Sequence, residues 1–193
     1  MFFDVVVEEL AMSLGVKYAF ISQLVTLDEL KELDPTEYMD LLDQFGGVVP
    51  PIDGVMHNIS CWPGDAHIHP HAFQGYLVDC TIHQKNVCIQ SKLSQKHNEV
   101  SECLLDQSIE SYVGVRLETT QGEIVGVIGI IHDRVLTHED GRIVSMVLEQ
   151  VGCRVANELD RMRSEANLIY ARDVAESTAK NKTKFLADMS HEI

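Results

Sequence analysis

The side chains in this sequence that most readily bind metal ions gather in one short region, at His57, Cys61, His67, His69 and His71. A His-x-His-x-His run on a β-strand would place its three imidazoles on one face, because side chains alternate along a strand. Such a triad could hold zinc, copper or iron, or supply a haem ligand. Pro70 interrupts the run and disfavours a regular strand, so the alternative is a polar loop with solvated histidines.

A second group that could do chemistry is the pair His191 and Glu192. Residues 185–193 read Phe-Leu-Ala-Asp-Met-Ser-His-Glu-Ile, and this run resembles the H-box of sensor histidine kinases, F-L-A-x-M-S-H-E-[IL]. The resemblance implies that His191 takes a phosphoryl group from ATP, and that Glu192 orients the imidazole and accepts its proton. The family motif continues with Arg-Thr-Pro-Leu. We therefore expect the ATP-binding domain, which uses ATP and Mg²⁺, outside these residues, and we expect the fragment alone to be inactive.

The spacing of Met189 and His191 suits a phosphoacceptor. Such a histidine must reach both a kinase domain and the aspartate of a response regulator receiver domain, so it must face solvent. Residues two apart lie about 200° apart around a helix, so Met189 in a buried seam would point His191 outward. The alternative is an ordinary exposed histidine.

One long helix is predicted to carry this motif. Thr137 to Asp140 fit a helix start, with a Thr N-cap and an acid at the third helical position. No proline follows, and the only later glycines are Gly141 and Gly152. A helix from there to Ile193 would be about 80 Å long and would need a partner along its length. We therefore predict a parallel coiled-coil homodimer.

The apolar residues of this helix predict where the two copies meet. A first heptad seam is expected at Val155, Leu159, Met162, Ala166 and Ile169. A second, out of phase with the first, runs from Ala171 to Met189. Continuing the first would bury Asp173 and Glu176, which is costly unless they are paired. The seam is therefore expected to slip between about 166 and 175.

The rest of the chain predicts a domain that mixes helices and strands. The predicted segments are an amphipathic helix at 3–14, a strand at 16–25, an acidic helical region at 28–45, an edge strand at 48–59, a loop at 60–75, a helix near 100–109, and a hairpin of strands 111–117 and 123–131. This order predicts an α+β fold, an antiparallel sheet flanked by helices, followed by the long C-terminal coiled-coil helix.

Three runs in this domain resemble the C-terminal half of a GAF domain. Residues 109–117 are similar to the family's I-x-S-Y-x-G-V-P-L, residues 121–130 to D-G-x-x-x-G-x-L-x-V, and residues 155–161 to A-x-x-E-L-x-R. Residues 15–22 match the family's first strand. Arg116 replaces the family's proline, and the mid-domain L-x-G-T-P-C segment is poorly matched around 76–82. The motifs for bilin attachment and for cyclic-nucleotide binding are absent.

The GAF resemblance implies a small-ligand pocket between the sheet and the cross-over segment. That pocket would be lined from residues 60–90, including Tyr76, with Tyr112 and Arg116 contributed by a strand. Alternation along that strand puts Tyr112, Gly114 and Arg116 on one side. An arginine facing the pocket could bind an anion bidentately. The alternative is an arginine at the edge of the sheet, in water or paired with Glu118.

These resemblances together predict three segments and one leading function. The segments are a GAF-like sensory domain at 1–161, a signalling helix at 162–180 and the start of a phosphoacceptor domain at 181–193. The leading hypothesis is the sensory and dimerisation fragment of a two-component sensor histidine kinase. The alternatives are a ligand-free GAF spacer that serves only dimerisation, and a metal-binding or haem-binding GAF sensor that uses the His/Cys cluster at 57–71.

The composition of the chain limits the kinds of binding partner and the cellular compartment that we expect. Thirty acids against 15 bases give a net charge of −15, which disfavours nucleic acid and anionic membranes as partners. We find no run of about 18 apolar residues and no signal peptide, so we expect a cytoplasmic fragment without membrane contact, although an anchor elsewhere in a longer protein is compatible. The five cysteines, an odd number without a C-x-x-C pair, are expected to be reduced thiols.

Overall fold

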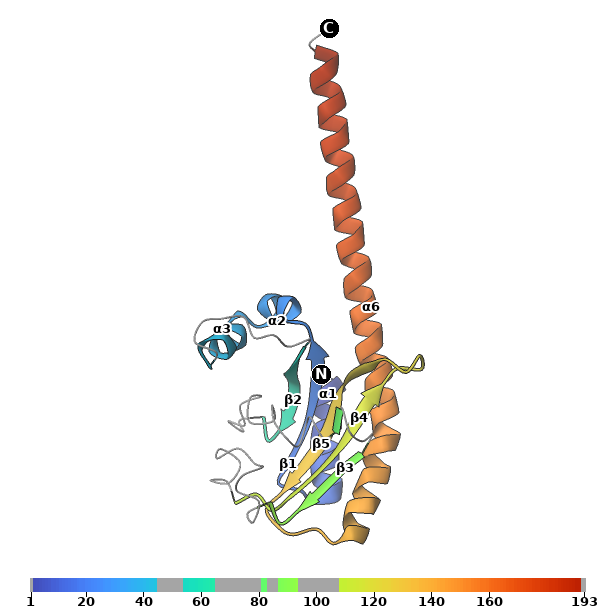
Figure 1. The fold of residues 1–193 in the computed structure, drawn as a ribbon. Helices are drawn as coiled ribbons and strands as arrows, with labels where there is room; N and C mark the ends of the chain where they lie inside the picture. Colours follow the sequence, from blue (N-terminus) through green and yellow to red (C-terminus); the bar gives the residue numbers. More distant parts are fainter. Residues whose placement is uncertain (1, 45–53, 65–80, 83–86, 94–107, 192–193) are drawn as a thin grey trace. The chain divides into compact units, whose positions relative to one another are not determined.

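The computed structural model describes residues 2–44, 54–64, 81–82, 87–93 and 108–191. Their helices and strands (Figure 1) are α1 (Phe2–Leu14), β1 (Tyr18–Val25), α2 (Leu27–Leu33), α3 (Pro35–Gln44), β2 (Val55–Trp62), β3 (Val87–Ser91), β4 (Ser111–Glu118), β5 (Ile124–His132) and α6 (His138–His191). The chain divides into two compact units, residues 1–157 and residues 158–193. Helix α6 belongs to both.

The first unit is built on a five-stranded sheet in the order β2-β1-β5-β4-β3. Every strand pairing in it is antiparallel, which confirms the predicted α+β class. The middle strand β5 is buried from Val125 to His132, as expected for its almost continuous apolar run. At the hairpin between β4 and β5, Gly122 has φ +81° and donates its N–H to the carbonyl of Thr119, so the predicted turn is confirmed.

Strand β2 lies at an edge of the sheet, as its sequence predicted, but it extends further than expected. The prediction of a loop from residue 60 is wrong for Ser60, Cys61 and Trp62, which continue the strand. Trp62 pairs with Ala19, and the pairing with β1 contains a bulge, because Ile21 pairs with Ser60 whereas Ser22 pairs with Asn58. The bulge was not visible in the sequence, because it depends on the partner strand.

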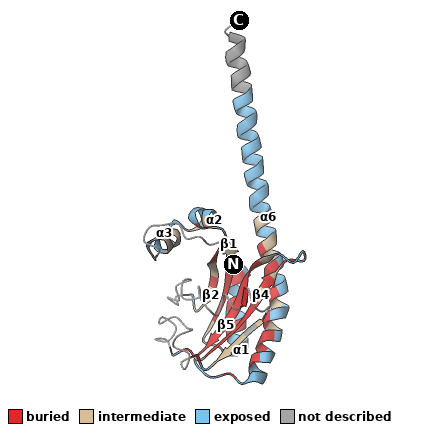
Figure 2. Cartoon of the chain, in the orientation of Figure 1, coloured by how far each residue is buried: buried red, intermediate tan, exposed pale blue. Residues whose placement is uncertain are grey.

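One face of the sheet is covered by α1 and by the first part of α6. Helix α1 buries Phe3, Val7, Leu10 and Ala11. A side chain at Gly152 of α6 would lie 3.2 Å from Leu117 and 3.6 Å from Ile128, so glycine allows the helix to approach β4 and β5 closely. Figure 2 shows the resulting buried layer in the strands. This packing fixes the start of α6 on the sheet.

The start of α6 is set by a capping box that the sequence predicted. The hydroxyl of Thr137 accepts a hydrogen bond from the N–H of Asp140 at 3.1 Å, and the Asp140 carboxylate accepts one from the N–H of Thr137 at 3.2 Å. The carboxylate also accepts the Thr137 hydroxyl proton at 2.7 Å. These hydrogen bonds lower the pKa of Asp140 and keep the acid charged at the positive end of the helix.

The exposure of α6 changes along its length. Val155 and Leu159 are 0% and 1% exposed in a single chain. They were predicted to form the first part of the coiled-coil seam, and that prediction is wrong for both residues, because their side chains are already buried within their own chain. From Ser164 to Lys182 every residue is exposed. Figure 2 shows this second region of the helix in pale blue.

Candidate functional site

The sheet face opposite α1 carries the residues that were predicted to line a ligand pocket. At its centre Gly114 of β4 pairs directly with Gly129 of β5. A Cβ at Gly129 would lie 2.6 Å from the ring of Phe20, and a Cβ at Gly114 would overlap the phenol of Tyr112. The two glycines therefore leave a depression that these two aromatic rings fill. The rings stack with centroids 6.4 Å apart at 23°.

Tyr112 is fully buried in this cluster. Its hydroxyl lies 3.0 Å from the hydroxyl of Thr81, which is itself buried. The buried apolar residues around it include Met56, Ile82 and Leu93. The hydrogen bond satisfies a phenol that would otherwise be costly to bury. Direct contact between Tyr112 and a ligand stays a prediction.

Arg116 lies on the same face of β4, and its guanidinium is held by the protein itself. Its Nη1 donates a hydrogen bond of 2.9 Å to the carbonyl oxygen of Ile82. Its Nη2 forms an ion pair with Glu118, two residues along the strand. The side chain is only 19% exposed, so these contacts are largely shielded from water. Arg116 thus ties Ile82 to the sheet, while its binding of an anionic ligand stays a prediction.

Arg116→Ala should lower the free energy of unfolding by about 1–3 kcal/mol, because it removes a charged donor and leaves the Ile82 carbonyl without it. Denaturant titration would measure this loss. Glu118→Gln is the matched control and should cost less than about 1 kcal/mol, since it removes only the partly exposed ion pair. An Arg116→Ala chain with unchanged stability and abolished ligand binding would assign Arg116 to the ligand instead.

The structure describes two of the five residues of the proposed metal-binding cluster. His57 and Cys61 lie on β2, and Cys61 is a half-buried free thiol that donates to the carbonyl oxygen of Pro63 at 3.7 Å. His67, His69 and His71 lie outside the described residues, as does Tyr76. Within the described segments, no group of three His, Cys, Asp or Glu side chains is arranged to hold a metal ion.

The predicted phosphoacceptor His191 is the last residue of α6, and its neighbour Glu192 lies outside the described residues. The predicted helix is therefore confirmed as one element of 54 residues that reaches the histidine. Its backbone places residues 185–191 of the H-box-like run on helix.

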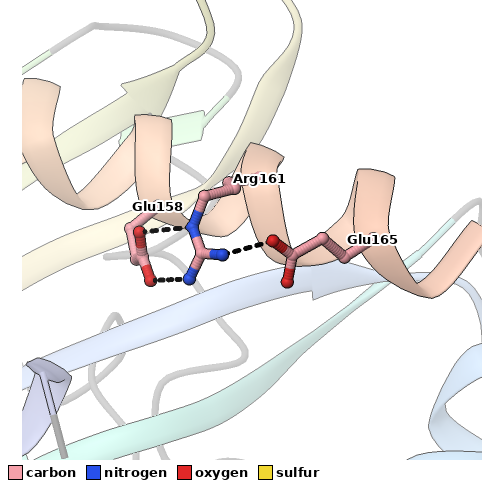
Figure 3. Close-up of polar contacts among 3 residues, drawn as sticks. All are labelled: Glu158, Arg161 and Glu165. Atoms are coloured by element: carbon pink, nitrogen blue, oxygen red, sulfur yellow. Dashed lines mark hydrogen bonds and ion pairs between the residues drawn. The ribbon is translucent and has the colours of Figure 1, made fainter.

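An ion-pair cluster lies on α6 at the beginning of the second unit (Figure 3). Arg161 donates from Nε and Nη2 to the two carboxylate oxygens of Glu158, at 3.0 and 2.6 Å, and from Nη1 to Glu165. The hydrogen bonds from Arg161 lower the pKa of Glu158, and those acids raise the pKa of Arg161. Pairs three and four residues apart support helix on an exposed surface, so the cluster favours α6 where apolar burial ends.

A second charged group lies where the predicted seam was expected to slip. Arg172 donates to Asp173 at 3.0 Å and approaches Glu176 at 3.8 Å. All three side chains are exposed in a single chain. Burial of Asp173 and Glu176 in a coiled-coil seam would be costly. Both acids thus have a cationic neighbour, Arg172, within their own helix.

Sequence reasoning did not single out Phe20, Thr81 or the facing pair of glycines. The period of two along a strand did place Tyr112 and Gly114 on one face. It could not show that Gly129 pairs with Gly114, because register between strands is fixed by three-dimensional pairing. Thr81 lies in a segment whose secondary structure could not be predicted from its residues.

Comparison with known proteins agrees with this architecture. The family profile of the GAF domain matches residues 1–155, well over half of the 193 residues. The chain therefore belongs to the GAF domain family. No curated protein shows significant sequence similarity to it.

The comparison with solved structures found the following two. One is a domain assigned to a two-component sensor histidine kinase protein of Sinorhizobium meliloti 1021, with a TM-score of 0.56 and 16% identity over 89% of this chain and 94% of that chain. The other is the phycoerythrobilin-bound GAF domain of a cyanobacterial phytochrome, with a TM-score of 0.47 and 14% identity over 84% and 86%. At these identities the first similarity concerns the fold alone.

None of the described helices combines the length and the apolar character that crossing a bilayer would need.

Proposed function

We propose that this chain is the sensory and dimerisation part of a two-component sensor histidine kinase. In this proposal the GAF domain binds a small ligand, a parallel homodimer forms through α6, and the helix relays the bound state to His191. The proposed setting is the cytoplasm, and the partner that receives the phosphoryl group is a response regulator receiver domain.

The chemistry of the proposed phosphoacceptor is simple. An imidazole nitrogen of His191 forms a bond to the γ-phosphorus of ATP while ADP leaves, and Glu192 accepts the proton that the ring loses. The phosphoryl group then passes to an aspartate carboxylate of the receiver domain. ATP and Mg²⁺ act in the kinase domain of the full-length protein, whereas this fragment supplies the histidine and its orientation.

The observation that carries the proposal is the continuity of α6. One helix begins with a capping box beside the sheet, packs through Leu148 and Val155, and reaches the H-box-like run without interruption. A helix transmits rotation and translation along its axis, so a change at the sensory domain can alter how His191 is presented. The fold similarity to a domain assigned to a sensor kinase supports the same reading.

The relay can be tested by changing the phase of α6. In a chain extended through its kinase domain, two residues inserted after Glu176 would rotate His191 by about 200° relative to the sensory domain. Seven inserted residues would rotate it by only about 20°. We expect the two-residue insertion to change phosphorylation of His191 on the order of tenfold, and the seven-residue insertion to stay near wild type. Equal activity of both insertions would contradict a relay through the helix.

A further inference from the structure

Two serine hydroxyls hold the segment that joins β5 to α6. The hydroxyl of Ser111 donates a hydrogen bond to the carbonyl oxygen of Arg134 and accepts one from the N–H of Leu136, both at 2.8 Å. The hydroxyl of Ser91 donates to the carbonyl oxygen of Leu136 at 2.9 Å. Side chains of the sheet therefore bind both backbone groups of Leu136, which directly precedes Thr137, the N-terminal cap of α6. We call Ser91, Ser111 and Leu136 the serine clasp.

The serine clasp lies on the face of the sheet that α6 covers. Ser91 of β3 pairs directly with Ser111 of β4, so the two hydroxyls leave the sheet side by side. Ile89 lies two residues before Ser91 and therefore on the same side of β3. It comes so close to α6 that a Cβ at Gly141 would be 2.7 Å from it. Strand β3 thus meets the beginning of α6 both through a hydrogen bond and through an apolar side chain.

The same strand reaches the opposite face of the sheet within two residues. Leu93 is fully buried in the apolar cluster that contains Tyr112, on the face predicted to bind a ligand. Regular alternation would keep Ser91 and Leu93 on one face. Lys92 between them has φ +59°, a left-handed conformation that is uncommon for a residue with a side chain, and this turn directs Leu93 to the other face. The ligand face and the serine clasp are therefore only two residues apart along the chain.

We propose that the serine clasp couples the apolar cluster on the predicted ligand face to the first turn of α6. A change in how Leu93 packs moves β3, and Ser91 then shifts Leu136 and with it the start of the helix. Strand β3 can move in this way because it lies at an edge of the described sheet. Ser91 and Ser111 are thus positioning residues for α6. This inference rests on the proposed function and adds the contact through which the sensory domain acts on the helix.

Amide hydrogen exchange of the 193-residue chain, followed by NMR, tests the serine clasp. Ser91→Ala and Ser111→Ala should each speed exchange of the Leu136 N–H about tenfold, because each removes a hydrogen bond that fixes this residue. Ser91→Thr keeps the hydroxyl and should exchange like wild type. Ser145→Ala is the matched control, since Ser145 is a buried serine whose hydroxyl bonds the carbonyl oxygen of Arg142 within α6. It should leave exchange at Leu136 unchanged.

Leu93→Ala tests the coupling to the ligand face. It should speed exchange at Leu136 about tenfold in a chain that keeps Ser91, and should add nothing in a Ser91→Ala chain. Val127→Ala is the matched control, because Val127 belongs to the same buried cluster but lies on β5. All rates are taken relative to the β5 amides, which exchange when the whole domain unfolds. On that scale Val127→Ala should leave Leu136 unchanged.

Unchanged exchange at Leu136 in Ser91→Ala would overturn the serine clasp, and this variant carries the test if a change at the fully buried Ser111 prevents folding. An effect of Leu93→Ala that is the same with and without Ser91 would overturn the coupling. Labelling of His191 in a chain extended through its kinase domain separates this inference from the proposed function. Faster exchange in Ser91→Ala with unchanged labelling would leave the clasp in place and contradict the relay through α6. Changed labelling with unchanged exchange would overturn the clasp alone.

Discussion

Replacing His191 with glutamine should abolish phosphorylation of the protein. In a chain extended through its phosphoacceptor and ATP-binding domains, radioactive phosphate from ATP should appear in wild type and fall to background in His191→Gln. Glutamine keeps a polar side chain of similar length but has no ring nitrogen that can attack phosphorus. The label should be lost in acid and kept in base, because a phosphorus–nitrogen bond hydrolyses in acid.

The matched control is His138→Gln, since His138 lies on the same helix at its other end. This variant should keep full labelling. Labelling that survives in His191→Gln would remove His191 from the role of phosphoacceptor. Label that resists acid would indicate a phosphorylated hydroxyl side chain instead, and it would exclude this chemistry even if the total amount were unchanged.

Val155→Asp should destabilise the sensory domain by about 3–5 kcal/mol, because it places an unpaired carboxylate where valine is fully buried. A loss of that size is a large fraction of the stability of an ordinary domain. Thermal or denaturant unfolding, followed by near-ultraviolet circular dichroism, would measure it. The expected result is an unfolded or barely folded first unit at 37 °C.

Met162→Asp provides the comparison, because Met162 is 47% exposed and lies in the second unit. Met162→Asp should weaken self-association, while the free energy of unfolding of the sensory domain stays unchanged. If Val155→Asp instead weakened only self-association and left the domain stable, Val155 would belong to an interface between copies and not to the core.

Val155 and Leu159 also show where sequence reasoning reached its limit for the fold. Local signals succeeded, because a capping box at Thr137 or a glycine turn at Gly122 is decided by neighbouring residues. The heptad spacing of Val155, Leu159 and Met162 was equally clear. Spacing alone does not show which element the apolar side of the helix packs against. The same stripe packs on a sheet or on a second helix, and the position of the sheet decides between them.

For the candidate site, too, local features could be predicted from the sequence and long-range contacts could not. The motif at 185–193 could be recognised because its residues are consecutive, and its helical setting followed from a long sequence without breakers. Arg116 was correctly placed on the side of β4 that carries Tyr112. Its hydrogen bond to Ile82 could not be foreseen, because the two residues are 34 positions apart in the sequence and only the folded protein brings them together.

The capping box and the buried first turns of α6 also bear on how the exposed helix forms. Starting a helix in water is unfavourable by a factor of about 10³, or about 4 kcal/mol, whereas each added residue costs little. The folded sensory domain supplies this nucleus, because it fixes the first turns of α6 on the sheet. Helix growth then proceeds in one direction, towards His191. The helical order of the histidine therefore depends on a domain whose nearest buried residue is many turns away.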